Sequence, residues 1–247
     1  MRLAVCVKQV RIVGDEIMFR DDGADVSIEE VDFSLNEWDS YATEEALRLR
    51  ETHGGEVVAV TYGDENADAV LRRCLAMGVD RAARVVGDAT DPIAIAGELA
   101  AALAAEAPDL VLCGVQSSDS VQAATGAAIA ELIGLPCVAV VTRLEVQGGV
   151  ALVHRELEGG LVDVMEVDLP ALITIQTGIN EPRYANLRAI KQAEQLTIPV
   201  LESSPGHSTL RVQSMYVPEA RVRAESLGND PASVAARITE LVKERLG

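Results

Sequence analysis

The stretch Asp109-Leu-Val-Leu-Cys-Gly-Val-Gln-Ser-Ser-Asp-Ser120, continuing through Val121-Gln-Ala-Ala-Thr-Gly126, decides how this chain folds. A short apolar run ends at Gly114, and a polar loop and a helix that begins with small residues follow. α/β proteins use this order of strand, loop and helix to bind an anion or nucleotide at the carboxyl end of a parallel strand. An ordinary strand-to-helix connection, with Asp119 or Ser120 as the helix N-cap, would explain the same residues.

Strands and helices alternate on either side of this stretch. Apolar runs that indicate buried strands lie at 3–7, 57–60, 81–86, 110–113, 137–141 and 172–175. Helices are expected after Asn36 as N-cap, after Asp64 as far as Gly78, after Asp91-Pro92 and near 187–193. The alternation predicts an α/β fold with a doubly wound, mostly parallel sheet. Its successive strands are expected to follow one another through right-handed crossovers.

Three segments depart from this alternation. Residues 11–34 are acidic, with short extended pieces expected around 16–20 and 25–28. Residues 142–168 form a predicted β-hairpin insert with Gly turns. Residues 1–201 are therefore expected to form a nucleotide-binding α/β domain, and 202–247 an extended C-terminal arm. The arm ends in a helix capped by Asp230-Pro231, whose apolar stripe docks either on the chain's own body or on another subunit; the stripe comprises Val234, Ile238, Leu241 and Val242.

Composition excludes several classes of partner. The chain has 39 acidic and 21 basic residues, a net charge of −18, and this surface repels nucleic-acid phosphates and anionic lipid heads. Aromatic residues make up 3% of the chain, too few for a platform on which bases stack. No apolar run approaches transmembrane length, so we expect neither nucleic acid nor a membrane as partner. A protein partner with a basic face is compatible with the charge.

No catalytic or metal-binding motif is present. The four cysteines are scattered without ligand spacing, which argues against a metal site and fits a reducing cytoplasm, and no signal segment precedes the first strand. Phosphate-binding and nucleophile motifs are missing, and the histidines fall at a helix end, in a hairpin and in the arm. The chain is therefore interpreted as a binding protein and not as an enzyme.

Several pieces of the chain, in order and spacing, resemble the β subunit of electron transfer flavoproteins, and the resemblance covers nearly the whole chain. It rests on Val5-Cys-Val-Lys8, Asn36 with Ala42-Thr-Glu-Glu-Ala-Leu-Arg-Leu49, Leu75-Ala-Met-Gly-Val-Asp-Arg81, Asp109-Leu-Val-Leu-Cys-Gly114 with Gln116, Asp119 and Thr125-Gly126, Arg155-Glu-Leu-Glu-Gly-Gly160, Leu169-Pro-Ala171 and Asn180-Glu-Pro-Arg-Tyr184.

The resemblance implies a heterodimer whose α subunit carries the redox-active FAD, while the β subunit, similar in fold to adenine-nucleotide α-hydrolases, holds a structural AMP. It also implies that the C-terminal arm embraces the α subunit. Leu187 would anchor partner dehydrogenases, and electrons would pass to an acceptor such as a quinone oxidoreductase. Carried over by position, the AMP site comprises Cys6, Asn36, Glu37, Trp38, Asp39, Tyr62, Gly114, Val115, Gln116, Ser117, Ser118, Asp119, Ser120, Val121, Gln122, Ala123, Ala124 and Thr125.

Departures from the family pattern keep alternatives open. Ala123 and Ala124 stand where polar residues are common, so a second FAD could replace AMP, as in the branch of the family that bifurcates electrons. The lysine-rich run after Leu187 is thinned, and Arg11-Ile12 replaces the usual Pro-Asp. The donor need not be an acyl-CoA dehydrogenase. A stand-alone nucleotide-binding protein of the universal-stress type is the rival interpretation, and a hydrolase of the same fold is the weakest.

Overall fold

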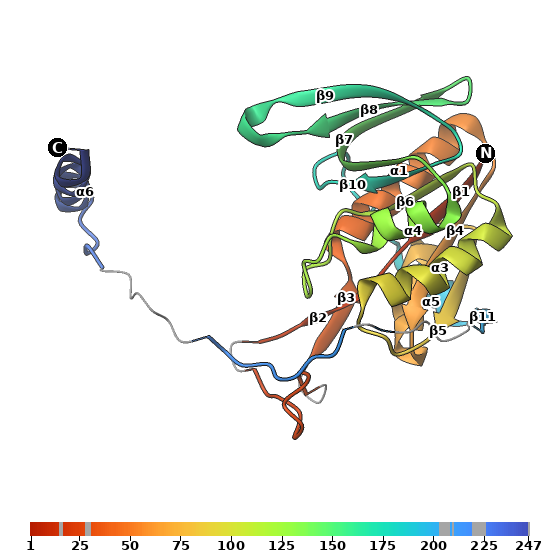
Figure 1. The fold of residues 1–247 in the computed structure, drawn as a ribbon, viewed down its shortest axis with the longest axis horizontal. Helices are drawn as coiled ribbons and strands as arrows, with labels where there is room; N and C mark the ends of the chain where they lie inside the picture. Colours follow the sequence, from red (N-terminus) through yellow and green to blue (C-terminus); the bar gives the residue numbers. More distant parts are fainter. Residues whose placement is uncertain (15–16, 28–30, 203–207, 209, 219–225, 247) are drawn as a thin grey trace.

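A nine-stranded sheet forms the centre of the computed structural model, which describes residues 1–14, 17–27, 31–202, 208, 210–218 and 226–246 (Figure 1). The spatial order is β11-β5-β4-β1-β6-β10-β7-β8-β9. All neighbours from β11 to β7 pair in parallel. The strands are β1 (Arg2–Cys6), β4 (Glu56–Gly63), β5 (Arg81–Val86), β6 (Leu110–Gly114), β7 (Cys137–Gln147), β8 (Val150–Glu156), β9 (Val162–Asp168), β10 (Ala171–Ile175) and β11 (Val200–Leu201).

The predicted fold class is confirmed, but the succession of the strands is not. β10 lies between β6 and β7, although it follows both of them in the sequence. Its five residues are all buried, and a strand of this kind is most stable in the interior of a parallel sheet. The hairpin insert therefore extends the sheet outward from β7 through β8 and β9, and the chain then returns to form β10 on the inner side of β7.

Helices cover both faces of the parallel strands. On one face, the apolar sides of α1 (Glu37–His53) and α2 (Asp68–Met77) share a core with Leu3 and Val5 of β1. On the other face, α3 (Pro92–Glu106) and α4 (Thr125–Ile133) share a second core with Ala4 and Cys6 of the same strand. Alternate side chains of one strand thus enter two cores, as expected for a strand buried on both faces.

The acidic segment near the N-terminus holds a small second sheet that the sequence did not predict. β2 (Gln9–Ile12) pairs antiparallel with β3 (Asp32–Leu35). The two expected extended pieces, around 16–20 and 25–28, lie partly outside the described residues, and between them only Phe19 and Val26 form an isolated bridge. The alternation of apolar and polar residues that predicts a strand is weak in β2 and β3, because each is only four residues long and partly exposed.

The predicted hairpin insert is present, with β7, β8 and β9 paired antiparallel at the edge of the large sheet. It has no separate first strand, because β7 runs unbroken from the parallel core into the insert. Val140, with a positive φ of 63°, lies where the register of β7 shifts. A left-handed residue of this kind marks a bulge that redirects a strand.

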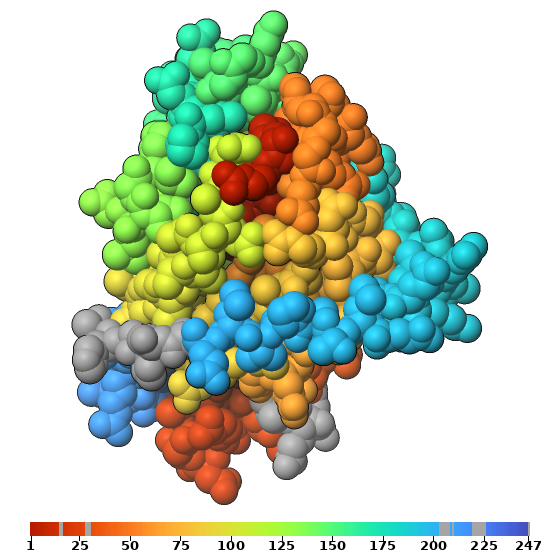
Figure 2. Space-filling model, turned by 90° about the vertical axis from the view of Figure 1, so that its right-hand side faces the viewer, coloured from red at the N-terminus to blue at the C-terminus, as the bar shows by residue number. Residues whose placement is uncertain are grey.

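The opposite edge of the sheet is covered by the segment that follows α5 (Leu187–Glu194). Arg84 of β5 donates its backbone N–H to the carbonyl of Pro199, and β11 then pairs with β5. Figure 2 shows this cyan-to-blue segment lying against the orange and yellow part of the chain, which includes β4 and β5. β11 ends at Leu201, the residue at which the α/β domain is expected to end, and the division into domain and arm stays a prediction.

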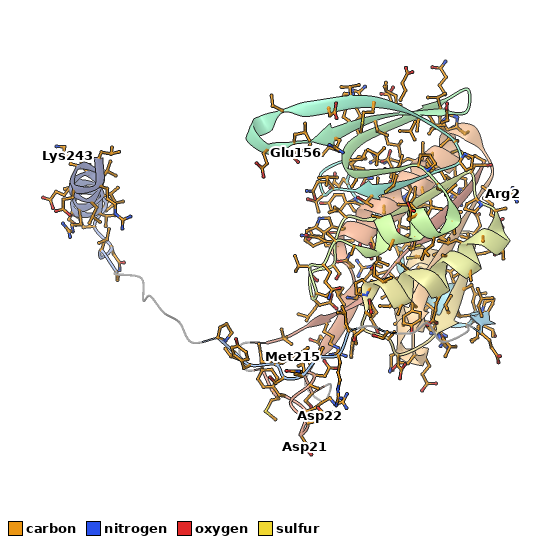
Figure 3. The ribbon with its side chains drawn as sticks, viewed as in Figure 1. Arg2, Asp21, Asp22, Glu156, Met215 and Lys243 are labelled. Atoms are coloured by element: carbon orange, nitrogen blue, oxygen red, sulfur yellow. The ribbon has the colours of Figure 1, made fainter. Side chains whose placement is uncertain are left out.

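The C-terminal arm leaves this edge and passes the acidic N-terminal segment. The backbone N–H of Met215 donates to the carbonyl of Gly23 at 2.7 Å, and Figure 3 shows Met215 beside Asp21 and Asp22. The predicted terminal helix is present as α6 (Pro231–Leu246), and the Asp230 carboxylate accepts the backbone N–H of Ser233 as its cap. In Figure 1, α6 stands apart from the sheet, and none of its described residues is buried. No helix in the described part of the chain is long and apolar enough to span a membrane.

Candidate functional site: the crevice between β1 and β6

The order of the strands reverses at β1. From β1 the chain builds outward through β4 and β5, and it then returns to the other side of β1 to form β6. In open α/β sheets, ligands bind at such a switch point, outside the carboxyl ends of the strands. Two segments leave the sheet there, namely the residues after Cys6 and the loop that follows Gly114. The sequence placed the nucleotide site at these two strand ends.

Asp39, in the first turn of α1, joins the two strand ends. Its carboxylate oxygens accept the backbone N–H groups of Lys8 and Gly114, both at 2.8 Å. Burial raises the pKa of the Asp39 carboxyl to about 6, although the two backbone hydrogen bonds act in the opposite direction. The carboxylate thus accepts two main-chain donors from segments that are far apart in the sequence, and it ties these two segments together at the switch point.

Asn36 precedes α1, but its side chain does not cap the helix as the sequence predicted. The Asn36 amide nitrogen donates to the carbonyl of Gln116 at 2.8 Å, and its amide oxygen accepts the N–H of Ser118 at 3.3 Å. The indole N–H of Trp38 donates to the side-chain oxygen of Gln176 after β10. The start of α1 is therefore hydrogen-bonded to the loop after β6. The Asn36 side chain binds Gln116, 80 residues away in the sequence, in place of the N–H groups of its own helix.

The loop between β6 and α4 is longer than an ordinary strand-to-helix connection. α4 begins at Thr125 with Ala124 as its N-cap, so neither Asp119 nor Ser120 caps it. Val121 and Ala123 have positive φ values of 51° and 50°. Non-glycine residues in this left-handed region cost about 1–3 kcal/mol each and cluster at functional sites. This loop therefore carries backbone strain beside the unpaired N–H groups of the first turn of α4.

Gly126 brings the first turn of α4 close to the sheet. A Cβ at this position would lie 2.7 Å from Cys113 Sγ and 2.9 Å from Cγ2 of Thr174. Only glycine allows this approach, which places the positive end of the α4 dipole near the carboxyl end of β6. The glycine of the Thr125-Gly126 pair is therefore needed for packing beside the site.

Lys8 is a site residue that the sequence analysis did not select. Its ammonium group lies 2.6 Å from the Asp119 carboxylate and 3.2 Å from the hydroxyls of Ser117 and Ser120. Burial raises the pKa of Asp119, but the hydrogen bonds from Lys8, Ser117 and the backbone of Ser120, together with the charge of Lys8, outweigh burial and bring the pKa below its usual value. The position of Lys8 directly after the first buried strand could have pointed to it, because strand ends at a switch point face the ligand.

Tyr62 and Cys6, two predicted site residues, support the crevice from the α3 side of the sheet. The Tyr62 hydroxyl accepts the backbone N–H of Ala89 at 3.0 Å, and a Cβ at Gly87 would lie 2.0 Å from that oxygen. Tyr62 thus holds the loop before α3. Burial, and then the nearby Asp39, raises the pKa of Cys6 to about 12, so its thiol is neutral. Glu37 and Gln122 are exposed, and Val115 is half-buried.

Leu187 begins α5, well separated in the chain from the crevice, and 78% of its surface is exposed. The side chain of Asn186 accepts the N–H of Ala189 and caps this helix. A shallow groove along α5 is lined by Leu187, Arg188, Lys191, Gln192 and Gln195. Leu187 is therefore available to an external partner, as a docking residue must be. In the described part of the chain, no cluster of His, Cys, Asp and Glu side chains could hold a metal ion.

Gly114→Ala is expected to lower nucleotide content at least tenfold and to destabilise the fold. The new Cβ would lie 2.5 Å from Cβ of Trp38 and 2.6 Å from Asp39 Oδ1, so α1 would have to move away from the crevice. Gly97→Ala in α3 is the matched control, because nothing lies within 4 Å of its added Cβ, and alanine favours a helix. Thermal denaturation and nucleotide release of both variants check this, and wild-type nucleotide content in Gly114→Ala would contradict it.

Comparisons with known proteins identify the family to which the chain belongs. A family model described as "Electron transfer flavoprotein domain" matches residues 25–205. An "Electron transfer flavoprotein subunit beta" of Methylophilus methylotrophus is 40% identical over 266 positions, covering all of both chains. Proteins with the same description are 32% identical in Bacillus subtilis, over 98% of each chain, and 38% identical in Bradyrhizobium diazoefficiens, over 80% of each chain. The chain therefore belongs to the electron transfer flavoprotein family, as a β subunit.

Proposed function

We propose that this chain binds AMP in the crevice between β1 and β6 and pairs with an α subunit that carries FAD. In this proposal the complex carries electrons from dehydrogenases to a downstream acceptor such as a quinone oxidoreductase, and α5 of this chain supplies the docking face. The observation that carries the proposal is the set of hydrogen bonds by which the Asn36 and Asp39 side chains hold the backbone of Gly114–Ser118.

The groups around the crevice suit a nucleotide phosphate. The Lys8 ammonium and the Ser117 and Ser120 hydroxyls lie together on one side of the loop, and the first turn of α4 contributes N–H groups and the positive end of its dipole. The Lys8 ammonium is paired with the Asp119 carboxylate, so a phosphate bound here would have to share Lys8 with this carboxylate or displace it. AMP supplies no redox chemistry, so the residues around it need only to bind and orient it.

Exposed apolar side chains on the C-terminal arm and on the acidic N-terminal segment support the proposal that a protein partner binds there. Ile12 and Met18 in the N-terminal segment are more than half exposed, and so are Leu210, Tyr216 and Val217 of the arm. Met215 joins these two segments through its hydrogen bond to Gly23. Exposed apolar side chains gathered on two adjoining segments are typical of an interface, and we assign this one to the α subunit. The cytoplasmic location remains a prediction from the scattered cysteines.

The nucleotide content of the complex tests the proposal. The chain is co-expressed with the α-type subunit encoded beside it, and the complex is purified and denatured. The released nucleotides are then quantified by chromatography. One FAD and one AMP per complex is the expected result.

Other outcomes identify the alternatives. Two FAD and no AMP would mean that this chain holds a redox-active flavin, as in a bifurcating complex. A self-sufficient homodimer that binds a nucleotide without an α subunit would favour the universal-stress interpretation. No complex and no nucleotide would overturn the proposal.

A further inference from the structure

The segment between β10 and α5 is fastened along the outer side of α1. At its start, the side chain of Gln176 accepts the indole N–H of Trp38 at 2.9 Å. Four residues later, the Asn180 amide nitrogen donates to the carbonyl of Tyr41 at 3.0 Å and to the Glu45 carboxylate at 2.9 Å. The segment therefore follows α1 from its first turn onward.

Arg183 makes the last and strongest of these attachments. Its Nε and Nη2 donate to the two oxygens of Glu44 at 2.7 and 3.0 Å, and its Nη1 donates to Glu51 at 2.6 Å. The backbone N–H of Arg183 also donates to Glu44 at 3.2 Å. A guanidinium fork that binds one carboxylate with two N–H groups fixes orientation as well as distance. The backbone of Arg183 is thus held at a defined place on α1.

Glu44 is an unusual partner because its side chain is only 4% exposed. Burial by itself would raise the pKa of the Glu44 carboxyl, but hydrogen bonds from Arg183 and Arg48 bring it below its ordinary value. A buried carboxylate strongly favours keeping a cationic partner. The attachment is therefore more persistent than an exposed surface ion pair, which contributes little.

The chain changes character directly after Arg183. Tyr184 is 95% exposed and Leu187 is 78% exposed. Beyond them, α5 is held at its other end, where Ala193 is buried and Pro199 bonds to β5. α5 itself packs against α2, but Tyr184 and Leu187, at its start, are exposed and take little part in this packing.

We infer that Arg183 is a positioning residue for the docking face: by bridging Glu44 and Glu51 it holds on α1 the segment that leads into α5, and so presents Leu187 in a fixed position. The inference rests on the proposed function for the docking role of Leu187, while the clamp itself depends only on the contacts given above. Because Asn36 and Asp39 lie on the same helix, α1 is the common frame of the nucleotide crevice and the docking face.

Amide hydrogen exchange of the purified full-length protein, in the assembly in which it is isolated, tests the clamp. In Arg183→Met, exchange is expected to be about tenfold faster or more in residues 184–194, with little change in α3 or at 110–114. Arg183→Lys keeps the charge without the fork, so it is expected to give an intermediate rate. Leu187→Ala is expected to exchange like wild type, because its side chain is exposed.

Arg81→Met is the matched control. Arg81 also bridges two carboxylates, those of Glu56 and Glu106, but at the amino end of the sheet, and its loss is expected to leave α5 unchanged. Unchanged exchange at 184–194 in Arg183→Met would overturn the inference. Exchange that is faster throughout the chain would also overturn it, because it would mean that Arg183 contributes only to the stability of the whole fold. The nucleotide content of the same samples tests the proposed function separately, so failure of one does not imply failure of the other.

Discussion

Asp39→Asn is expected to weaken nucleotide retention about 10- to 100-fold. Both carboxylate oxygens accept backbone N–H groups, from Lys8 and from Gly114. An amide can accept only with its oxygen, so its NH₂ group would face one of these donors and leave it unpaired. An unpaired buried donor costs about 1–3 kcal/mol, which corresponds to this loss if the crevice must close to bind. Equilibrium binding of AMP to the nucleotide-stripped complex provides the measurement.

Asp109→Asn is the matched control for this substitution. The Asp109 carboxylate also accepts a backbone N–H, that of Arg2 at 2.7 Å, but at the amino end of the sheet. AMP affinity is expected to remain at the wild-type level in this variant. Equal losses in both variants would show that the effect of Asp39 is one of general stability and not of the crevice.

The Asp39→Asn substitution is also expected to change how the free energy of unfolding depends on pH. The pKa of Asp39 is raised from 3.8 to about 6, so the folded chain binds a proton more tightly than the unfolded chain. The contribution of Asp39 to stability is therefore largest below about pH 4 and is lost as pH rises through about 6, by up to roughly 3 kcal/mol. In Asp39→Asn this part of the pH dependence of unfolding is expected to disappear, and an unaltered profile would contradict the assignment.

The double substitution Ile238→Asp and Val242→Asp is expected to weaken association with the α subunit at least 100-fold. The two side chains are 48% and 49% exposed on α6, which has no buried residue of its own. An apolar side chain of this size contributes about 1.5–3 kcal/mol when a partner buries it, and an unpaired carboxylate in the interface adds a desolvation cost. Size-exclusion chromatography and affinity measurements on the co-expressed subunits check the result.

Ala232→Asp combined with Ala236→Asp is the control, because it adds the same two charges on the side of α6 that faces away from the stripe. Both residues are exposed, and wild-type association is expected. If the Ile238 and Val242 variant associates as tightly as wild type, the stripe on α6 is not an interface, and the arm must serve another purpose.

Local patterns in the sequence were sufficient for the elements around the crevice. The apolar run before Gly114 became β6, the small residues from Thr125 became the start of α4, and Asp91-Pro92 began α3 as expected. Such elements are predictable because buried strands and capped helices depend on neighbours in the sequence. β2 and β3 were missed because they are short and partly exposed, and their pairing depends on contact with each other.

The positions of the strands and the partners of the polar side chains were decided by the tertiary structure. Nothing in the local sequence of β10 distinguishes a place between β6 and β7 from a place after β7. Asn36 is a residue type that commonly caps helices, yet its side chain binds a loop 80 residues away. That loop offers an acceptor, the Gln116 carbonyl, and a donor, the Ser118 N–H, side by side. Lys8 reaches Asp119 in the same manner, across 111 residues.

The sequence by itself therefore determined the fold class, the family and the stretch that borders the crevice, since these depend on periodicity and on motifs in a fixed order. Only the tertiary structure showed that α1 holds both the end of β6, through Asp39, and the segment that leads into α5, through Glu44 and Glu51. The physical reason is that a hydrogen bond depends on distance and direction in space. Residues that are remote in the chain become partners only when the sheet has brought them together.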